Sequence, residues 1–241
     1  MSHFCVAVFS DTPDDASFDR LLAPYDENNN DNFSRHVTPL NVIRGEYKSF
    51  LKQNPSWKEH GFKYYLKQMG YKIEDKQIVT YYNDNSKYDY YTLDAKDYLF
   101  KRKPFVVLDW LTQERYRKND YDFSSKEGES EYGEAWCSAF WDWCVEEKPW
   151  SFMHEPEPDP YYSREYYIDK YGTKETYIRS ELSSAPFAFI SPDGVWHEPG
   201  TMGWFAVDNS KPEGVSKYLD EWDAFIASEA NPYVSFVDCH I

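Results

Sequence analysis

The two ends of this chain carry the patterns that most constrain its fold. Near the C-terminus, the apolar run Phe187–Ile190 is followed at once by Ser191-Pro192-Asp193-Gly194. Proline fixes the φ of one turn residue and Asp-Gly supplies the positive φ of a tight reversal, so this tetrapeptide predicts a turn after a strand. A second apolar run, Met202–Val207, and the closing run Tyr233–Ile241 predict two further strands.

A helix is predicted between the last two of these strands. Pro212 stands where its first turn would begin, a position that tolerates a missing amide. Apolar side chains then recur at helical spacing and form one stripe, at Val215, Leu219, Trp222 and Ile226. Asn231-Pro232 is expected to end the helix.

The first residues supply a fourth strand. Ser2–Ser10 is almost continuously apolar, as expected of a strand covered on both faces. The resulting order predicts an α+β fold, in which the two chain ends form a ferredoxin-like split βαβ unit around a large mixed α/β insertion. Its first and last strands are expected to be antiparallel neighbours. The predicted division is a sheet core of residues 1–37 plus 183–241 and an inserted, aromatic-rich subdomain of residues 38–182.

Two local patterns stand out within the predicted insertion. Tyr71–Tyr82 and Lys87–Leu93 flank the turn-forming segment Asn83–Ser86, which predicts a β-hairpin. Tyr161–Leu182 predicts a helix that is interrupted near Gly172.

Composition and charge narrow the function classes. Aromatic residues make up 20% of the 241 residues, and large rings bury enough area to predict a globular chain rather than a disordered one. The formal net charge of −16 disfavours direct contact with nucleic acid or anionic membranes and favours a partner with a basic surface. The same charge also serves solubility alone, and both interpretations remain open.

The chain begins without a basic, apolar-core leader and contains no run of about 18 apolar residues. Its cysteines, Cys5, Cys137, Cys144 and Cys239, show no CxxC spacing. These features predict a soluble protein with reduced thiols in a cytoplasm. No metal and no cofactor are expected.

Six short segments carry a resemblance to a known family. They are Met1–Val6, Ala23–Asn28, Asn85–Tyr91, Asp193–His197, Gly200–Phe205 and Val237–Ile241. In these segments the chain resembles uncharacterised proteins encoded mainly in tailed-phage genomes. The resemblance implies a phage accessory protein acting in the cytoplasm of the infected bacterial host. Relatives often follow the aromatic segment with Gly-Gly-Arg-Trp, where this chain has Thr92–Lys96.

A first candidate site is a group of histidines. His3, His240 and His197, with Asp238 nearby, offer acid–base or metal-ligand chemistry. Asp238 and His240 would share one face of the last strand. The alternative is that they only tie this strand down by hydrogen bonds.

A second candidate site is an aromatic cage that could stack on a base or a nicotinamide ring. Its members are Tyr88, Tyr90, Tyr91, Trp196 and Trp204. The alternative is that these rings form an aromatic core and cross-strand pairs.

A third candidate is an acidic surface that could meet a basic groove on a partner, with tyrosines as anchors. Its members are Asp26, Glu27, Glu155, Glu157 and Asp159. The alternative is a solvated surface without a partner.

Two functions follow from these candidates. The first is a phage-encoded counter-defence inhibitor that binds a host immune protein through an acidic, tyrosine-rich surface and catalyses nothing. The second is a binder or hydrolase of a nucleotide immune signal that uses the aromatic cage and the histidines. Nucleophilic catalysis has no support, because no GxSxG elbow is present and Cys137 and Cys144 share an apolar helix face.

Overall fold

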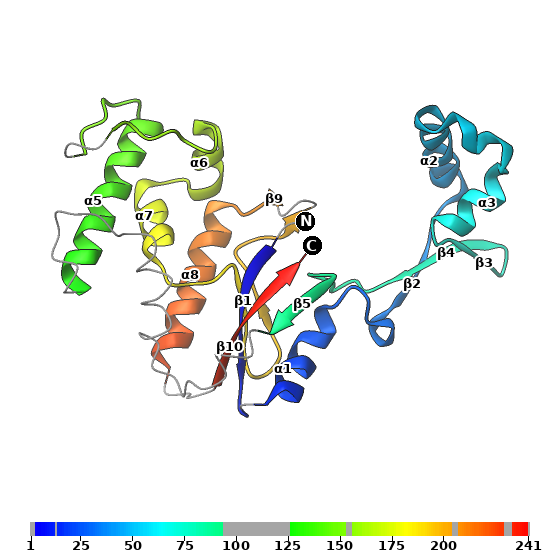
Figure 1. Ribbon diagram of the computed structural model, residues 1–241, viewed down its shortest axis with the longest axis horizontal. Helices are drawn as coiled ribbons and strands as arrows, with labels where there is room; N and C mark the ends of the chain where they lie inside the picture. Colours follow the sequence, from blue (N-terminus) through cyan, green and yellow to red (C-terminus); the bar gives the residue numbers. More distant parts are fainter. Residues whose placement is uncertain are drawn as a thin grey trace. The chain divides into compact units, whose positions relative to one another are not determined.

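The chain forms two compact units (Figure 1). Unit 1 comprises residues 1–22 and 91–241, and unit 2 comprises residues 23–90. The computed structural model describes residues 3–12, 14–93, 126–152, 156–203, 207–228 and 233–240. None of the helices in this described part combines the length and apolarity needed to span a bilayer.

A five-stranded sheet organises unit 1, in the order β5-β10-β1-β6-β7. The bounds of these strands, in that order, are Tyr90–Leu93, Tyr233–His240, His3–Ser10, Ala188–Ile190 and Trp196–His197. β1 is antiparallel to β10 and parallel to β6, and β6 is antiparallel to β7. A separate two-stranded ladder joins β8 (Met202–Gly203) to β9 (Val207–Asp208).

The pairing of β1 with β10 joins the two ends of the chain. It runs in one antiparallel register from His3 opposite His240 to Ser10 opposite Tyr233. Val6, Val8 and Val237, in the middle of this ladder, are fully buried. The expectation that the first and last strands are antiparallel neighbours is therefore confirmed.

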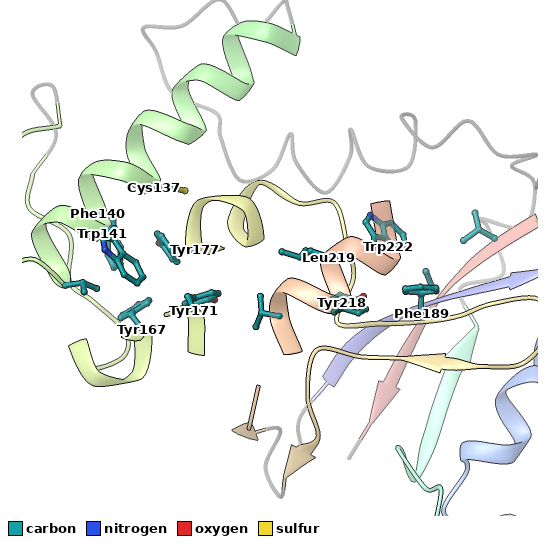
Figure 2. Close-up of a cluster of buried hydrophobic side chains, with 14 of the residues drawn as sticks. Cys137, Phe140, Trp141, Tyr167, Tyr171, Tyr177, Phe189, Tyr218, Leu219 and Trp222 are labelled. Atoms are coloured by element: carbon teal, nitrogen blue, oxygen red, sulfur yellow. The ribbon is translucent and has the colours of Figure 1, made fainter. Parts of the chain in front are cut away.

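Helices cover one face of the sheet and share its hydrophobic core (Figure 2). Ala7 and Phe9 of β1 and Phe189 of β6 pack against α8 (Pro212–Ala227), where Trp222 and Phe225 meet both phenylalanine rings. The same cluster continues into three further helices, α5 (Lys126–Cys144), α6 (Arg164–Tyr171) and α7 (Lys174–Leu182). The other face carries Val6 and Val8, since side chains alternate along a strand, and α1 (Asp15–Leu22) packs there (Figure 1).

Unit 2 is a three-stranded antiparallel sheet with two helices. Its strands lie in the order β2-β4-β3, with bounds Ser34–Val37, Gln77–Tyr82 and Lys72–Glu74. Between β2 and β3 lie α2 (Leu40–Gln53), the 3₁₀ segment η3 (Pro55–Glu59) and α3 (Gly61–Gln68). Two short 3₁₀ segments, η1 (Ala23–Tyr25) and η2 (Asn30–Asn32), precede them. The helices pack through Ile43, Tyr65 and Leu66.

Several sequence predictions hold in this architecture. The mixed α+β class is confirmed. Gly194 has a φ of 84°, as the predicted turn requires. The helix expected over 161–182 is present as α6 and α7, with Gly172 at a φ of 70° between them.

Other expectations differ from the structure. β1 and β6 pair directly, whereas a split βαβ unit would place a strand between them, so the described strands do not establish that unit. The structure also places the insertion at residues 23–90 rather than 38–182, because α5, α6 and α7 share the core of unit 1. The hairpin is expected between Tyr71–Tyr82 and Lys87–Leu93. In the structure β4 instead pairs with β3 across the turn at Asp75 and Lys76, and β5 lies beside β10.

Truncation of a ring at the centre of this core tests the packing. Phe189 is 1% exposed and contacts Phe9, Trp222 and Phe225. We expect Phe189→Ala to lower the free energy of unfolding by about 3–5 kcal/mol, because it removes buried area and leaves a cavity. Chemical denaturation measures the loss. The control Tyr161→Ala, at a side chain that is 87% exposed, is expected to change stability by less than about 0.5 kcal/mol.

Candidate functional site

Unit 1 contains a tyrosine-lined hollow of about 650 Å³. Its walls come from α6, α7 and the proline-rich segment before α6. Six tyrosines line it: Tyr161, Tyr162, Tyr166, Tyr167, Tyr171 and Tyr177. We call this feature the tyrosine pocket.

Local sequence explains why these rings converge. Ser163 caps α6 by accepting a hydrogen bond from the Tyr166 amide, and Thr173 caps α7 in the same way. Tyr167 and Tyr171 are four residues apart and therefore share one face of α6. Gly172, with its positive φ, turns the chain so that Tyr177 of α7 packs edge-on against Tyr171 at 5.2 Å between ring centroids.

The mouth of the pocket presents exposed rings. Tyr161 is 87% exposed and Tyr162 is 45% exposed. Tyr162 stacks on Tyr166 with 3.9 Å between ring centroids and 20° between ring planes. Exposed tyrosines that are held by stacked neighbours offer large contact area at low entropic cost, a property of interface anchors.

Lys170 is the one cation among the described residues that line the pocket. Its Nζ lies 2.6 Å from Asp208 Oδ2, and both side chains are less than 20% exposed. Burial disfavours the charge on each, but the pKa of Lys170 is raised by Tyr171 and Asp208, and hydrogen bonds from Lys170 and Ser210 lower the pKa of Asp208. Lys170 is therefore protonated, and the carboxylate of Asp208 already balances its positive charge.

Four tyrosines of the pocket, Tyr166, Tyr167, Tyr171 and Tyr177, are neutral at physiological pH. Burial raises the pKa of Tyr167 to about 12 and raises that of Tyr166. Burial, followed by the Glu181 carboxylate, also raises the pKa values of Tyr171 and Tyr177. Such phenols bind through their faces and hydroxyls and do not serve as bases.

The rim of the pocket is acidic. Asp159 and Glu181 line it together with the Lys170–Asp208 pair, so carboxylates outnumber cations there. Glu157, two residues before Asp159, is exposed. Glu155, the remaining acidic candidate of this segment, lies outside the described residues. The pocket is therefore expected to favour a cationic group and to disfavour phosphate.

The predicted aromatic cage is dispersed in the structure. Tyr88 is 1% exposed, and Tyr90 is 46% exposed. Tyr91 donates a hydrogen bond to Asp19, and the Trp196 indole donates one to Glu198. Trp204 lies outside the described residues. The structure thus places Tyr90 and Tyr91 on β5 and Trp196 on β7, at opposite edges of the sheet, with Tyr88 in a core.

Asp26 and Glu27 belong to a hydrogen-bonded junction inside unit 2. Asp26 forms a β-bridge with Tyr88, and the Glu27 amide donates to the Tyr88 carbonyl at 2.9 Å. Asn83 donates from its side chain to the carbonyls of Pro24 and Asp26. Two segments of the phage-like resemblance, near residues 25 and 88, are therefore brought together by backbone bonds.

The histidines do not converge on one point. His3 pairs with His240 in the β1–β10 ladder, and His240 is 4% exposed. Asp238 is exposed and lies opposite Cys5. His197 lies level with Phe189, and thus with Ala7, roughly 13 Å along the sheet from His3. Among the described residues, no group of three or more His, Cys, Asp or Glu side chains is placed to hold a metal ion.

His197 instead belongs to an array that sequence reasoning missed. Its Nε2 lies 3.2 Å from Ser191 Oγ, and its Nδ1 lies 3.0 Å from Glu221 Oε2. This is the order of atoms in a serine–histidine–acid triad. Ser191 and His197 are six residues apart and Glu221 is on α8, so no local spacing could have signalled the contact.

Two features prevent this array from acting as a nucleophile. Ser191 Oγ donates its hydrogen to Asp193 at 2.5 Å, and this hydrogen bond lowers the pKa of the Asp193 carboxyl. His197 therefore faces only the lone pairs of the Ser191 oxygen and has no hydroxyl hydrogen to accept. The amides of Ser191 and Gly194 donate to carbonyls of the turn, and so do not offer an oxyanion hole. The array braces the β6–β7 turn against α8.

Comparisons with protein-family models, with curated proteins and with solved structures find no match to this chain. Function is therefore inferred from its own residues.

An activity-based probe tests the interpretation of the Ser191 array. We expect a fluorophosphonate to leave Ser191 unlabelled after prolonged incubation, because its hydroxyl hydrogen is held by Asp193. Intact-mass spectrometry reads the result, with a serine hydrolase as positive control. An adduct that Ser191→Ala abolishes would show that the hydroxyl is activated after all.

The Lys170–Asp208 pair gives a stability prediction. Asp208→Asn leaves a partly buried ammonium without its partner, and we expect a loss of about 1–3 kcal/mol, less than for a fully buried pair. The Asp208 pKa is lowered on folding, so its contribution is present above the unfolded-state value of about 3.9 and is lost as pH falls through the folded value.

Denaturation of both proteins across pH measures this contribution. The difference between them should be constant from about pH 5 to 9 and should shrink in acid. Asp169→Asn is the matched control, because Asp169 and Lys211 form a pair that is more than 60% exposed on each side. Equal losses in the two variants would contradict the role of burial.

Proposed function

We propose that this chain is a phage-encoded counter-defence inhibitor that binds a basic surface of a host immune protein in the cytoplasm of the infected cell. It acts by binding and catalyses nothing. The observation that carries the proposal is the tyrosine pocket, whose rim is acidic and whose cation is neutralised by Asp208.

The distribution of charge supports a basic partner. The residues of unit 1 include 33 Asp+Glu against 16 Lys+Arg. Its net charge is therefore slightly more negative than that of the whole chain. A lysine or arginine of the partner would find aromatic faces at Tyr161 and Tyr162 and a carboxylate at Asp159. Such a contact combines long-range attraction with hot-spot anchors.

A nucleotide immune signal is the second candidate ligand. The volume of the pocket and its planar rings favour it, because a base could stack between tyrosines. Its phosphates would then meet Asp159, Glu181 and a lysine that is already paired. Isothermal titration with cyclic nucleotides, and chromatography of the products, would separate a binder from a hydrolase.

Capture from host lysate tests the first proposal. The intact chain should retain a basic protein at low salt and release it at high salt, because the attraction is partly electrostatic. The variant Tyr161→Ala/Tyr162→Ala should weaken capture at least tenfold, the cost expected when two anchors are truncated. Quantitative mass spectrometry of the retained proteins measures this.

The matched control removes two exposed tyrosines from unit 2, in the variant Tyr64→Ala/Tyr82→Ala. This variant should retain the same partner. Capture that is insensitive to salt, or equally weakened by both variants, would contradict recognition through the tyrosine pocket.

A further inference from the structure

The two units carry very different charges. Residues 23–90 contain 10 Lys+Arg against 9 Asp+Glu, a net charge of about +1. The expectation that the chain avoids nucleic acid used the charge of the whole chain, which is set by unit 1. At physiological ionic strength, salt screens interactions between exposed charges that are more than about 8 Å apart. The local charge of unit 2 therefore determines which charged partners it can bind.

Five of the ten cations of unit 2 lie on its two helices. Arg44, Lys48 and Lys52 follow one another every fourth residue along α2, and all three are exposed. Ile43 is fully buried on the core side of the same helix. Residues four apart lie on one face of a helix, so these cations form a single basic stripe turned away from the core.

The second helix and the hairpin carry further exposed lysines. Lys63 and Lys67 are four residues apart on α3, and both are exposed. Lys76 occupies the β3–β4 turn with a φ of 65°. Lys63 and Lys76 line the same hollow, so α3 and the hairpin present their charges together.

Five of these cations have no acidic partner among the described residues, whereas two acids of unit 2, Glu46 and Glu74, are engaged. Arg44, Lys48, Lys52, Lys63 and Lys67 form no ion pair with any residue that the structure describes. By contrast, Glu46 accepts a hydrogen bond from Tyr71, and Glu74 binds both Arg35 and Tyr81. Solvated cations that lack local partners are suited to an external polyanion.

Aromatic rings lie beside the lysines of η3 and α3. His60 and Tyr64 lie 4.7 Å apart between ring centroids, and Trp57 is 5.8 Å from Tyr64. Tyr64 is 41% exposed. Tyrosine hydroxyls and ring edges commonly join lysines in contacts to phosphate and sugar.

We propose that unit 2 binds duplex nucleic acid through its phosphodiester backbone, using the stripe on α2 and the lysines of α3 and the hairpin. A ladder of cations repeated every helical turn fits a regularly repeating polyanion. The order helix, helix, hairpin is also compatible with binding of the helix-turn-helix kind, in which the first helix contacts the nucleic-acid backbone and the second enters a groove.

An acidic protein segment is the rival partner, because the hollow between α3 and the hairpin is partly apolar. Its lining includes Leu40 and Ile73, which are 45% and 60% exposed. That partner would need the hollow and only the lysines at its rim. The stripe on α2 would then have no role, so variants on α2 distinguish the two partners.

Fluorescence anisotropy of the full chain with a labelled 24-base-pair duplex tests the proposal, in DNA and RNA arms. We expect saturable binding at low salt that weakens as salt rises, with a slope of about −3 or steeper in log K against log salt. Lys48→Glu/Lys67→Glu should weaken binding at least tenfold and flatten the slope by about 2. Lys48→Gln/Lys67→Gln should weaken it in the same direction.

The control is Lys211→Glu/Lys217→Glu in unit 1, which changes the net charge equally at side chains that are 63% and 77% exposed. It should bind as the unaltered chain does, and circular dichroism should show all variants folded. No binding to either duplex, equal loss in the control, or binding of a polyglutamate probe in place of the duplexes would overturn the proposal.

Discussion

The ladder between β1 and β10 is the contact on which the rest of unit 1 depends. It joins residues that are more than 220 positions apart and buries Val6, Val8 and Val237 completely. β6 and β7 extend the sheet from β1, and β5 borders β10. α8 packs its aromatic residues Trp222 and Phe225 against Phe9 and Phe189 of this sheet, and α5, α6 and α7 continue the same core. A long ladder is slow to form but, once formed, makes the two ends of the chain one cooperative structure.

The division of charge between the units suggests two different binding surfaces. Unit 1 holds the acidic excess and a pocket in which buried phenols stay neutral and Lys170 is paired with Asp208. Unit 2 holds solvated cations on α2 and α3. The proposed functions use these surfaces for contact area and electrostatic complementarity. The triad-like array at Ser191 is occupied in holding a turn.

Sequence reasoning predicted the elements whose signals are local. The turn at Gly194, the helix after Pro212, the break at Gly172 and the terminal strands each follow from the residues that form them. The tyrosine pocket was not predicted, because its rings are adjacent only after α6 and α7 fold back on each other. The burial of Tyr88 was also hidden, since it depends on backbone bonds to a segment about 60 residues earlier. The whole-chain charge concealed that unit 2 is nearly neutral and carries exposed cations on α2 and α3.

Hydrogen exchange of the intact chain, followed by mass spectrometry in increasing denaturant, tests the pairing of the ends most directly. The account predicts that peptides covering residues 3–10 and 233–240 are among the most protected of unit 1 and lose protection together. Rapid exchange of residues 233–240 while residues 3–10 stay protected would contradict it, because the last strand would then be no part of the sheet.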